Sequence, residues 1–155
     1  MNKIPAAAAL LLAACGFHPK GMQPYDRLPY QQWHIQGAQL QRPLENALRS
    51  AGGTPVPAAQ AQAVLKVEEA ETQKDVLTIT RAALVADYLL VLKVRAQAYR
   101  NGEPLGKPME AEVRRQLEYA DSEVLGKQEE EETVRREMQR DAAEQLVRRL
   151  SFLPH

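Results

Sequence analysis

Histidine and carboxylate side chains are the residues of this chain that could bind a metal ion or act in general acid–base catalysis. The three histidines, His18, His34 and His155, are widely separated in the sequence. The carboxylates of Glu129–Glu132 are consecutive, so on a helix they fan around the axis rather than converge on one ion. The sequence contains no G-x-S-x-G, Walker A or G-x-G-x-x-G motif. We therefore expect no catalysis, no metal and no cofactor.

The single cysteine, Cys15, suggests a covalent modification instead. A positive start at Lys3 is followed by an uncharged apolar run at 4–14, which would span about 16 Å as a helix. That is too short for a hydrocarbon core of about 30 Å and is typical of a signal-peptide core. Leu-Ala-Ala before Cys15 resembles the bacterial lipoprotein signal, in which the cysteine receives lipid and the chain is cut just before it.

We therefore expect a signal peptide at 1–14, with N-acyl (palmitate) and S-diacylglycerol groups on Cys15 as a stable membrane anchor. Gly16, where an aspartate would favour retention at the inner membrane, points to the outer membrane and its periplasmic side. The alternative is an ordinary free cysteine behind an export signal. A lone cysteine also excludes an intrachain disulfide.

Composition and charge limit the remaining classes. The chain has 155 residues, of which 45% are hydrophobic and 26% charged, as expected for one globular domain. Lys+Arg and Asp+Glu both number 20, so no overall positive charge attracts nucleic acid. We expect a lipid-anchored tether at 15–31 and one domain at 32–155.

Hydrophobic periodicity predicts the elements of that domain. A short strand near 33–36 precedes a helix that opens at Pro43 and closes at Gly52-Gly53. Alternation over 63–67 and 77–80 indicates either one long edge-like strand or two strands joined by a bend. A clear two-strand meander covers 88–98 and 109–119, with Arg115 alone breaking its apolar face.

Asn101-Gly102 between the meander strands is a strong turn pair, although Pro104 and Pro108 suggest a loop longer than two residues. A long amphipathic helix follows over 126–150. The order β-α-β-β-β-α, with one-sided strands, predicts an α+β two-layer sandwich. Its two helices pack on one face of a four-stranded mixed sheet.

Two basic residues stand at boundaries of the predicted elements. Arg81 closes the strand at 77–80, and Lys127 begins the last helix. If their turns are neighbours, they form a cationic patch for an anionic head group. Otherwise each is an ordinary solvated loop cation.

Four motifs together resemble the LPS-assembly lipoprotein (LptE/RlpB) family. They are Gly16-Phe17-His18 directly after Cys15, Ala86-Asp87-Tyr88, Leu125-Gly126-Lys127 and the terminal-helix segment 137–150. The resemblance covers Cys15 to about Leu153. It implies two helices packed against a four-stranded sheet.

The resemblance also implies a function. Such a lipoprotein plugs the outer-membrane β-barrel that inserts lipopolysaccharide, helps that barrel to assemble in a complex of about one to one, and binds lipopolysaccharide. The resemblance also implies that lipopolysaccharide is bound by basic residues in the loop before the long strand and at the start of the last helix. In this sequence, Arg81 and Lys127 stand at those two positions. The alternative is a structural assembly accessory that binds no glycolipid.

Overall fold

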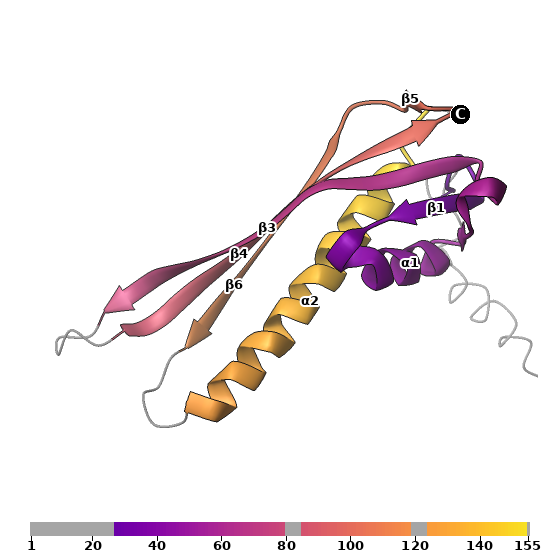
Figure 1. Ribbon diagram of the computed structural model, residues 1–155. Coiled ribbons are helices and arrows are strands. Elements are labelled where there is room, and N and C mark those ends of the chain that lie inside the picture. The colour runs from indigo at the N-terminus through magenta and orange to yellow at the C-terminus, as the bar shows by residue number, and fades with distance from the viewer. Residues whose placement is uncertain (1–26, 80–84, 119–123, 155) are drawn as a thin grey trace, which may run out of the picture.

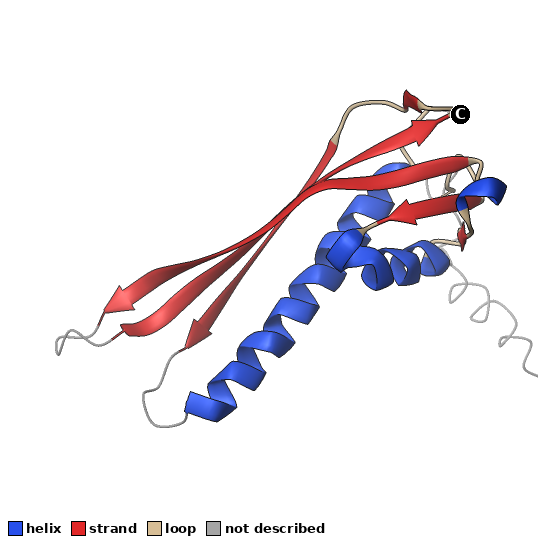
Figure 2. Cartoon of the chain, viewed as in Figure 1, coloured by secondary structure: helices blue, strands red, loops and turns tan. Residues whose placement is uncertain are grey.

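The computed structural model describes residues 27–79, 85–118 and 124–154, with the backbone alone at 78–79, 85–86 and 124–127. Its elements are, in order, β1 (Gln32–Gln36), η3 (Ala38–Leu40), α1 (Gln41–Ser50), β2 (Thr54–Pro55), η4 (Ala58–Gln60), β3 (Ala63–Ile79), β4 (Val85–Arg100), β5 (Glu103–Pro104), β6 (Met109–Glu118) and α2 (Val124–Leu150). Both main helices lie on one face of the sheet (Figure 1, Figure 2). The α+β two-layer class is therefore confirmed.

The sheet is mixed, as predicted, but it has six strands rather than four. Its order is β2-β1-β3-β4-β5, and β6 also pairs with β4. Strand β1 runs parallel to β2 and β3, whereas the pairings of β4 are all antiparallel. The two extra strands, β2 and β5, have two residues each, which is too short for a period of two to appear in the sequence.

The alternatives left open for the segment after residue 62 resolve into one strand, β3, of 17 residues. Its register with β4 shifts between Val67 and Glu69 and again between Val76 and Ile79, so bulges absorb the irregular pattern. Strand β1 pairs with 63–66 only. The rest of β3 is an edge of the sheet, which suits its many charged residues.

Asn101 and Gly102 form the tight turn that the pair predicts, with φ angles of 51° and 84°. The expected longer loop between the meander strands is confirmed, because residues 101–108, which include this turn and β5, separate β4 from β6. Pro104 is the last residue of β5 and Pro108 directly precedes β6, so both prolines lie between β4 and β6. The buried amide of Gln97 donates to the carbonyl of Leu105 at 3.4 Å and so contacts that connection.

Helix α1 begins at Gln41, two residues before Pro43, the position where the sequence predicts the start of the helix. Proline is still tolerated there, because the first four N–H groups of a helix have no intrahelical partner. Leu44 and Leu48 are fully buried, and the chain leaves the helix through Gly52, whose φ is 83°. That left-handed conformation strains any residue with a side chain.

One continuous core lies between the helices and the sheet. Trp33 is completely buried, and its indole N–H donates to the carbonyl of Tyr30 at 2.7 Å. The other large, fully buried side chains are Leu40, Leu44, Leu48, Leu65, Leu90, Leu92, Met138, Leu146 and Leu150. Among the described side chains of α2, the large, fully buried ones lie in its second half, from Met138 onward.

The molecule consequently has two unlike ends (Figure 1). The proximal end contains β1, β2, α1, β5 and the C-terminal half of α2. The distal end is where β3 stops at Ile79, β4 begins at Val85, β6 stops at Glu118 and α2 begins at Val124.

Candidate functional site

The two cations predicted to bind lipopolysaccharide neighbour elements that end or begin at the distal end. Arg81 lies in the chain between β3 and β4, outside the described residues. Lys127 lies in the first turn of α2, where the backbone alone is described. The structure thus brings the strands that flank Arg81 to the same end as the start of α2 (Figure 1).

Next to this end, an ion pair also links the sheet to α2. The ammonium of Lys74 on β3 lies 2.6 Å from a carboxylate oxygen of Glu131 on α2. The same ammonium lies 4.3 Å from the ring centroid of Tyr88 on β4, a cation–π distance. Three elements therefore meet at a single lysine.

Glu131 is also held from its own helix. The guanidinium of Arg135, one turn further along α2, lies 2.7 Å from Glu131. The hydrogen bond from Lys74, followed by that from Arg135, lowers the pKa of the Glu131 carboxyl below its ordinary value of 4.5, against an opposing effect of partial burial. The two contacts therefore stabilise the ionised form of Glu131.

A second ion pair crosses the same interface. Arg115 of β6 donates to the carboxylate of Asp141 on α2. Arg115 is the residue that interrupts the apolar alternation of its strand, and the contact explains the interruption. The break in periodicity was the sequence signal for this pair; its partner could not be identified without the fold.

Apolar side chains are exposed near the same end. Val76 and Leu77 of β3 are 51% and 49% exposed, and with Phe152 they are the large exposed hydrophobic residues of the described chain. The register with β4 shifts between Val76 and Thr78, so the two side chains stand at a bulge of the edge strand. The distal end therefore presents apolar groups beside a charged interface, a combination suited to an amphiphilic ligand.

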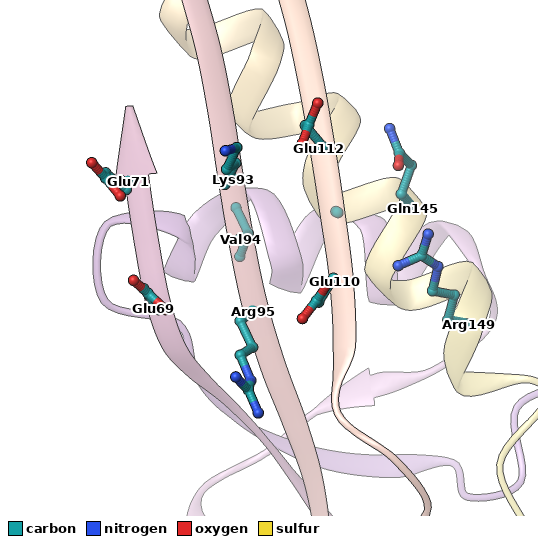
Figure 3. Close-up of a pocket in the computed structure, with 10 residues that line it drawn as sticks. Glu69, Glu71, Lys93, Val94, Arg95, Glu110, Glu112, Gln145 and Arg149 are labelled. Atoms are coloured by element: carbon teal, nitrogen blue, oxygen red, sulfur yellow. The ribbon is translucent and has the colours of Figure 1, made fainter. Parts of the chain in front are cut away.

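The sheet face turned away from the helices carries alternating charges (Figure 3). Glu69 and Glu110 flank Arg95 in register across three strands, and one pairing step along, Glu71 and Glu112 flank Lys93. These residues line an open hollow of about 500 Å³. Cross-strand pairs of opposite charge stabilise a solvated sheet face, which accounts for the pattern without a bound ligand.

Two further properties concern the described ranges 27–79, 85–118 and 124–154. No group of three or more His, Cys, Asp or Glu side chains lies together there in a way that could hold a metal ion. No helix in those ranges combines the length and apolar character needed to span a membrane. Cys15, the expected lipid-attachment site, lies outside them.

The described residues missed by sequence reasoning are those of the polar interface: Lys74, Tyr88, Glu131 and Asp141. Lys74 lies in a stretch whose only sequence signal is its polar character. Glu131 belongs to the run Glu129–Glu132, whose carboxylates fan around the helix axis. Nothing in their spacing predicts that they meet, because the contact depends on how α2 lies along the sheet.

Solved structures share this fold. A solution structure of lipoprotein B from Nitrosomonas europaea is 26% identical with a TM-score of 0.71, covering 88% of this chain and 90% of that one. The crystal structure of a minor lipoprotein from Acinetobacter baumannii is 24% identical with a TM-score of 0.69, covering 82% and 96%.

Proteins of known sequence and a family model are also similar to this chain. The LPS-assembly lipoproteins LptE of Pectobacterium atrosepticum and Yersinia enterocolitica are each 30% identical over 151 residues, or 92% of this chain, and the match covers 80% and 71% of those proteins. The family model for LptE, lipopolysaccharide-assembly, matches residues 30–150. This chain belongs to the LptE lipopolysaccharide-assembly family.

Proposed function

We propose that this protein is a lipid-anchored lipoprotein of the outer membrane that forms a complex with the lipopolysaccharide-assembly β-barrel and binds lipopolysaccharide at its distal end. The match to the family over residues 30–150 carries this proposal, because the family's function is lipopolysaccharide assembly. Cys15 supplies the anchor after cleavage of residues 1–14, and residues 15–31 form the tether.

The distal end suits the glycolipid part of this proposal. Lipid A phosphates are anionic and favour arginine and lysine. Arg81 and Lys127 stand in segments that border this end, and Val76 and Leu77 add exposed apolar surface beside them. A ligand with a phosphorylated head group and acyl chains matches both kinds of surface.

The ion pairs between the sheet and α2 have a supporting role. Lys74–Glu131 and Arg115–Asp141 join the strands to the helix on which Lys127 lies. The Lys74–Glu131 pair holds the N-terminal half of α2 against the sheet, and the Arg115–Asp141 pair holds its C-terminal half. We expect them to position the two cations rather than to contact the ligand.

Capture of the barrel tests the complex. The full-length chain, tagged at its C-terminus, is recovered from detergent-solubilised outer membrane under stringent washing. One large β-barrel protein recovered at about one to one supports the proposal. A Cys15→Ala variant is the matched control for the anchor, and it should leave the outer membrane for the soluble fraction.

Recovery of no barrel by the lipidated chain would contradict the complex. Recovery of the barrel by a chain that binds no lipopolysaccharide would favour the alternative, a structural accessory to assembly. The two results separate the proposal's parts.

A further inference from the structure

A groove between α1 and α2 has three arginines along its walls. Arg42 comes from the first turn of α1, and Arg136 and Arg140 come from α2. The groove encloses about 690 Å³, and the apolar side chains of Pro43 and Ala47 also line it. A volume of this size accommodates a small ligand or the head group of a larger one.

These guanidinium groups are poorly satisfied by the protein itself. Within the described part of the chain, Arg42 and Arg140 form neither a hydrogen bond nor an ion pair, and Arg136 donates only to the hydroxyl of Thr133 at 2.9 Å. Neighbouring Arg135, by contrast, has a carboxylate partner. The groove therefore collects donors whose hydrogen-bonding capacity is unused.

The groove is also more positive than the chain as a whole. Among its described lining residues, Glu144 is the sole carboxylate against the three arginines. The complete chain has a formal net charge of zero. An anionic ligand gains from this local excess without any general attraction of anions to the molecule.

We propose that this groove binds a phosphate group of lipopolysaccharide, as a second contact besides the distal end. Arg136 and Arg140 are one helical turn apart on one face of α2, and Arg42 adds a donor from α1. Guanidinium groups bind phosphate oxygens in bidentate fashion, and these three exposed arginines line one groove, which favours a compact dianion as the ligand. An acidic peptide, whose carboxylates are spaced along an extended chain, fits three donors gathered in one groove less well.

The groove is separate from the distal cations. At about 1.5 Å per residue, Arg136 lies about 14 Å and Arg140 about 20 Å along α2 from Lys127. No single phosphate spans that distance. This inference rests on the proposed function, because it assigns a further part of the same ligand to a different surface.

The experiment measures binding of lipopolysaccharide to the full-length lipidated chain in detergent, with Arg136→Gln/Arg140→Gln as the test variant. Loss of two charged hydrogen-bond donors should weaken binding by about tenfold or more. The matched control is Arg148→Gln/Arg149→Gln, which removes the same charge from α2 outside the groove and should leave affinity within about twofold. Far-ultraviolet circular dichroism and thermal unfolding establish that both variants fold.

Two further probes identify the ligand chemistry. Lipopolysaccharide stripped of phosphate should bind the parent and the test variant equally. Inorganic phosphate should bind the parent more weakly than lipopolysaccharide does, and equal affinity would overturn the assignment to a glycolipid. Equal loss in the test and control variants would overturn the groove, since it would indicate a general charge effect.

The outcome also separates this inference from the proposed function. If Arg81→Glu/Lys127→Glu weakens binding and the groove variant does not, the distal site stands and the groove inference fails. If the groove variant weakens binding and the distal variant does not, the groove stands and the distal assignment fails. If the groove variant retains binding but no longer captures the barrel, the groove inference fails and the groove's occupant is an acidic segment of that partner.

Discussion

The proximal and distal halves of the interface between α2 and the sheet differ in what fills the space between them. In the proximal half, Met138, Leu146 and Leu150 are fully buried against the core. Toward the distal end, the Lys74–Glu131 ion pair of partly exposed side chains joins the apolar contacts, although Leu90, opposite Lys74 in the sheet, is still fully buried. Burial of apolar area is the dominant stabilising contribution in folding, whereas exposed ion pairs contribute little. We therefore expect the apolar contacts of the proximal half to contribute more to the stability of the fold than the Lys74–Glu131 pair does.

The largest effect expected from this comparison is in the proximal core. Leu146→Ala removes a fully buried side chain and leaves a cavity, so it should lower the free energy of unfolding by about 2–5 kcal/mol. Chemical denaturation measures the loss. Val76→Ala, at a distal position that is 51% exposed, is the control and should change stability by less than about 0.5 kcal/mol. Similar losses in both variants would remove the distinction between the halves.

A smaller effect is expected from the ion pair between β6 and α2. Arg115→Ala should destabilise the protein by about 0.5–1 kcal/mol, a value reduced because the side chains of Arg115 and Asp141 are 42% and 30% exposed. Arg114→Ala is its neighbour on the opposite face, where the guanidinium pairs within its own strand and is 66% exposed. That control should have no measurable effect. A double-mutant cycle with Asp141→Ala that gave no coupling would show that the pair does not join β6 to α2.

The smallest effect on stability is expected from acid. Because the pKa of Glu131 is lowered on folding, its contribution is fully present above the unfolded value of 4.5 and is lost as pH falls through the folded pKa. The denaturation midpoint of the parent should therefore fall more steeply below pH 4.5 than that of Glu131→Gln. Thermal unfolding between pH 7 and about pH 3 measures this difference. Parallel curves would indicate that Lys74 and Arg135 do not stabilise the carboxylate.

Much of the fold could be predicted from periodicity because its main strands have one buried and one solvated face. The alternating pattern over 88–98 predicts β4, and the apolar stripe along 126–150 predicts α2. Strands β2 and β5 could not be predicted, since two residues carry no period and pair only because the neighbouring strand is present.

The site was less accessible from the sequence than the fold. The placement of Arg81 and Lys127 came from the family resemblance, and it remains a prediction. The anomaly at Arg115 was visible, but its partner Asp141 becomes a neighbour only through the packing of α2 on β6. The groove could not be predicted either, because Arg42 and Arg140 line it from two helices that are far apart in the sequence.

The most direct test of the proposed function is the affinity of the full-length chain for lipopolysaccharide, compared with that of Arg81→Glu/Lys127→Glu. The account predicts that the parent binds and that the variant binds at least about tenfold more weakly, because reversed charges repel the lipid phosphates. It also predicts an unchanged denaturation midpoint, since the distal end contributes little to stability. Equal affinity of the parent and the charge-reversed variant would contradict the claim that the distal end binds lipopolysaccharide.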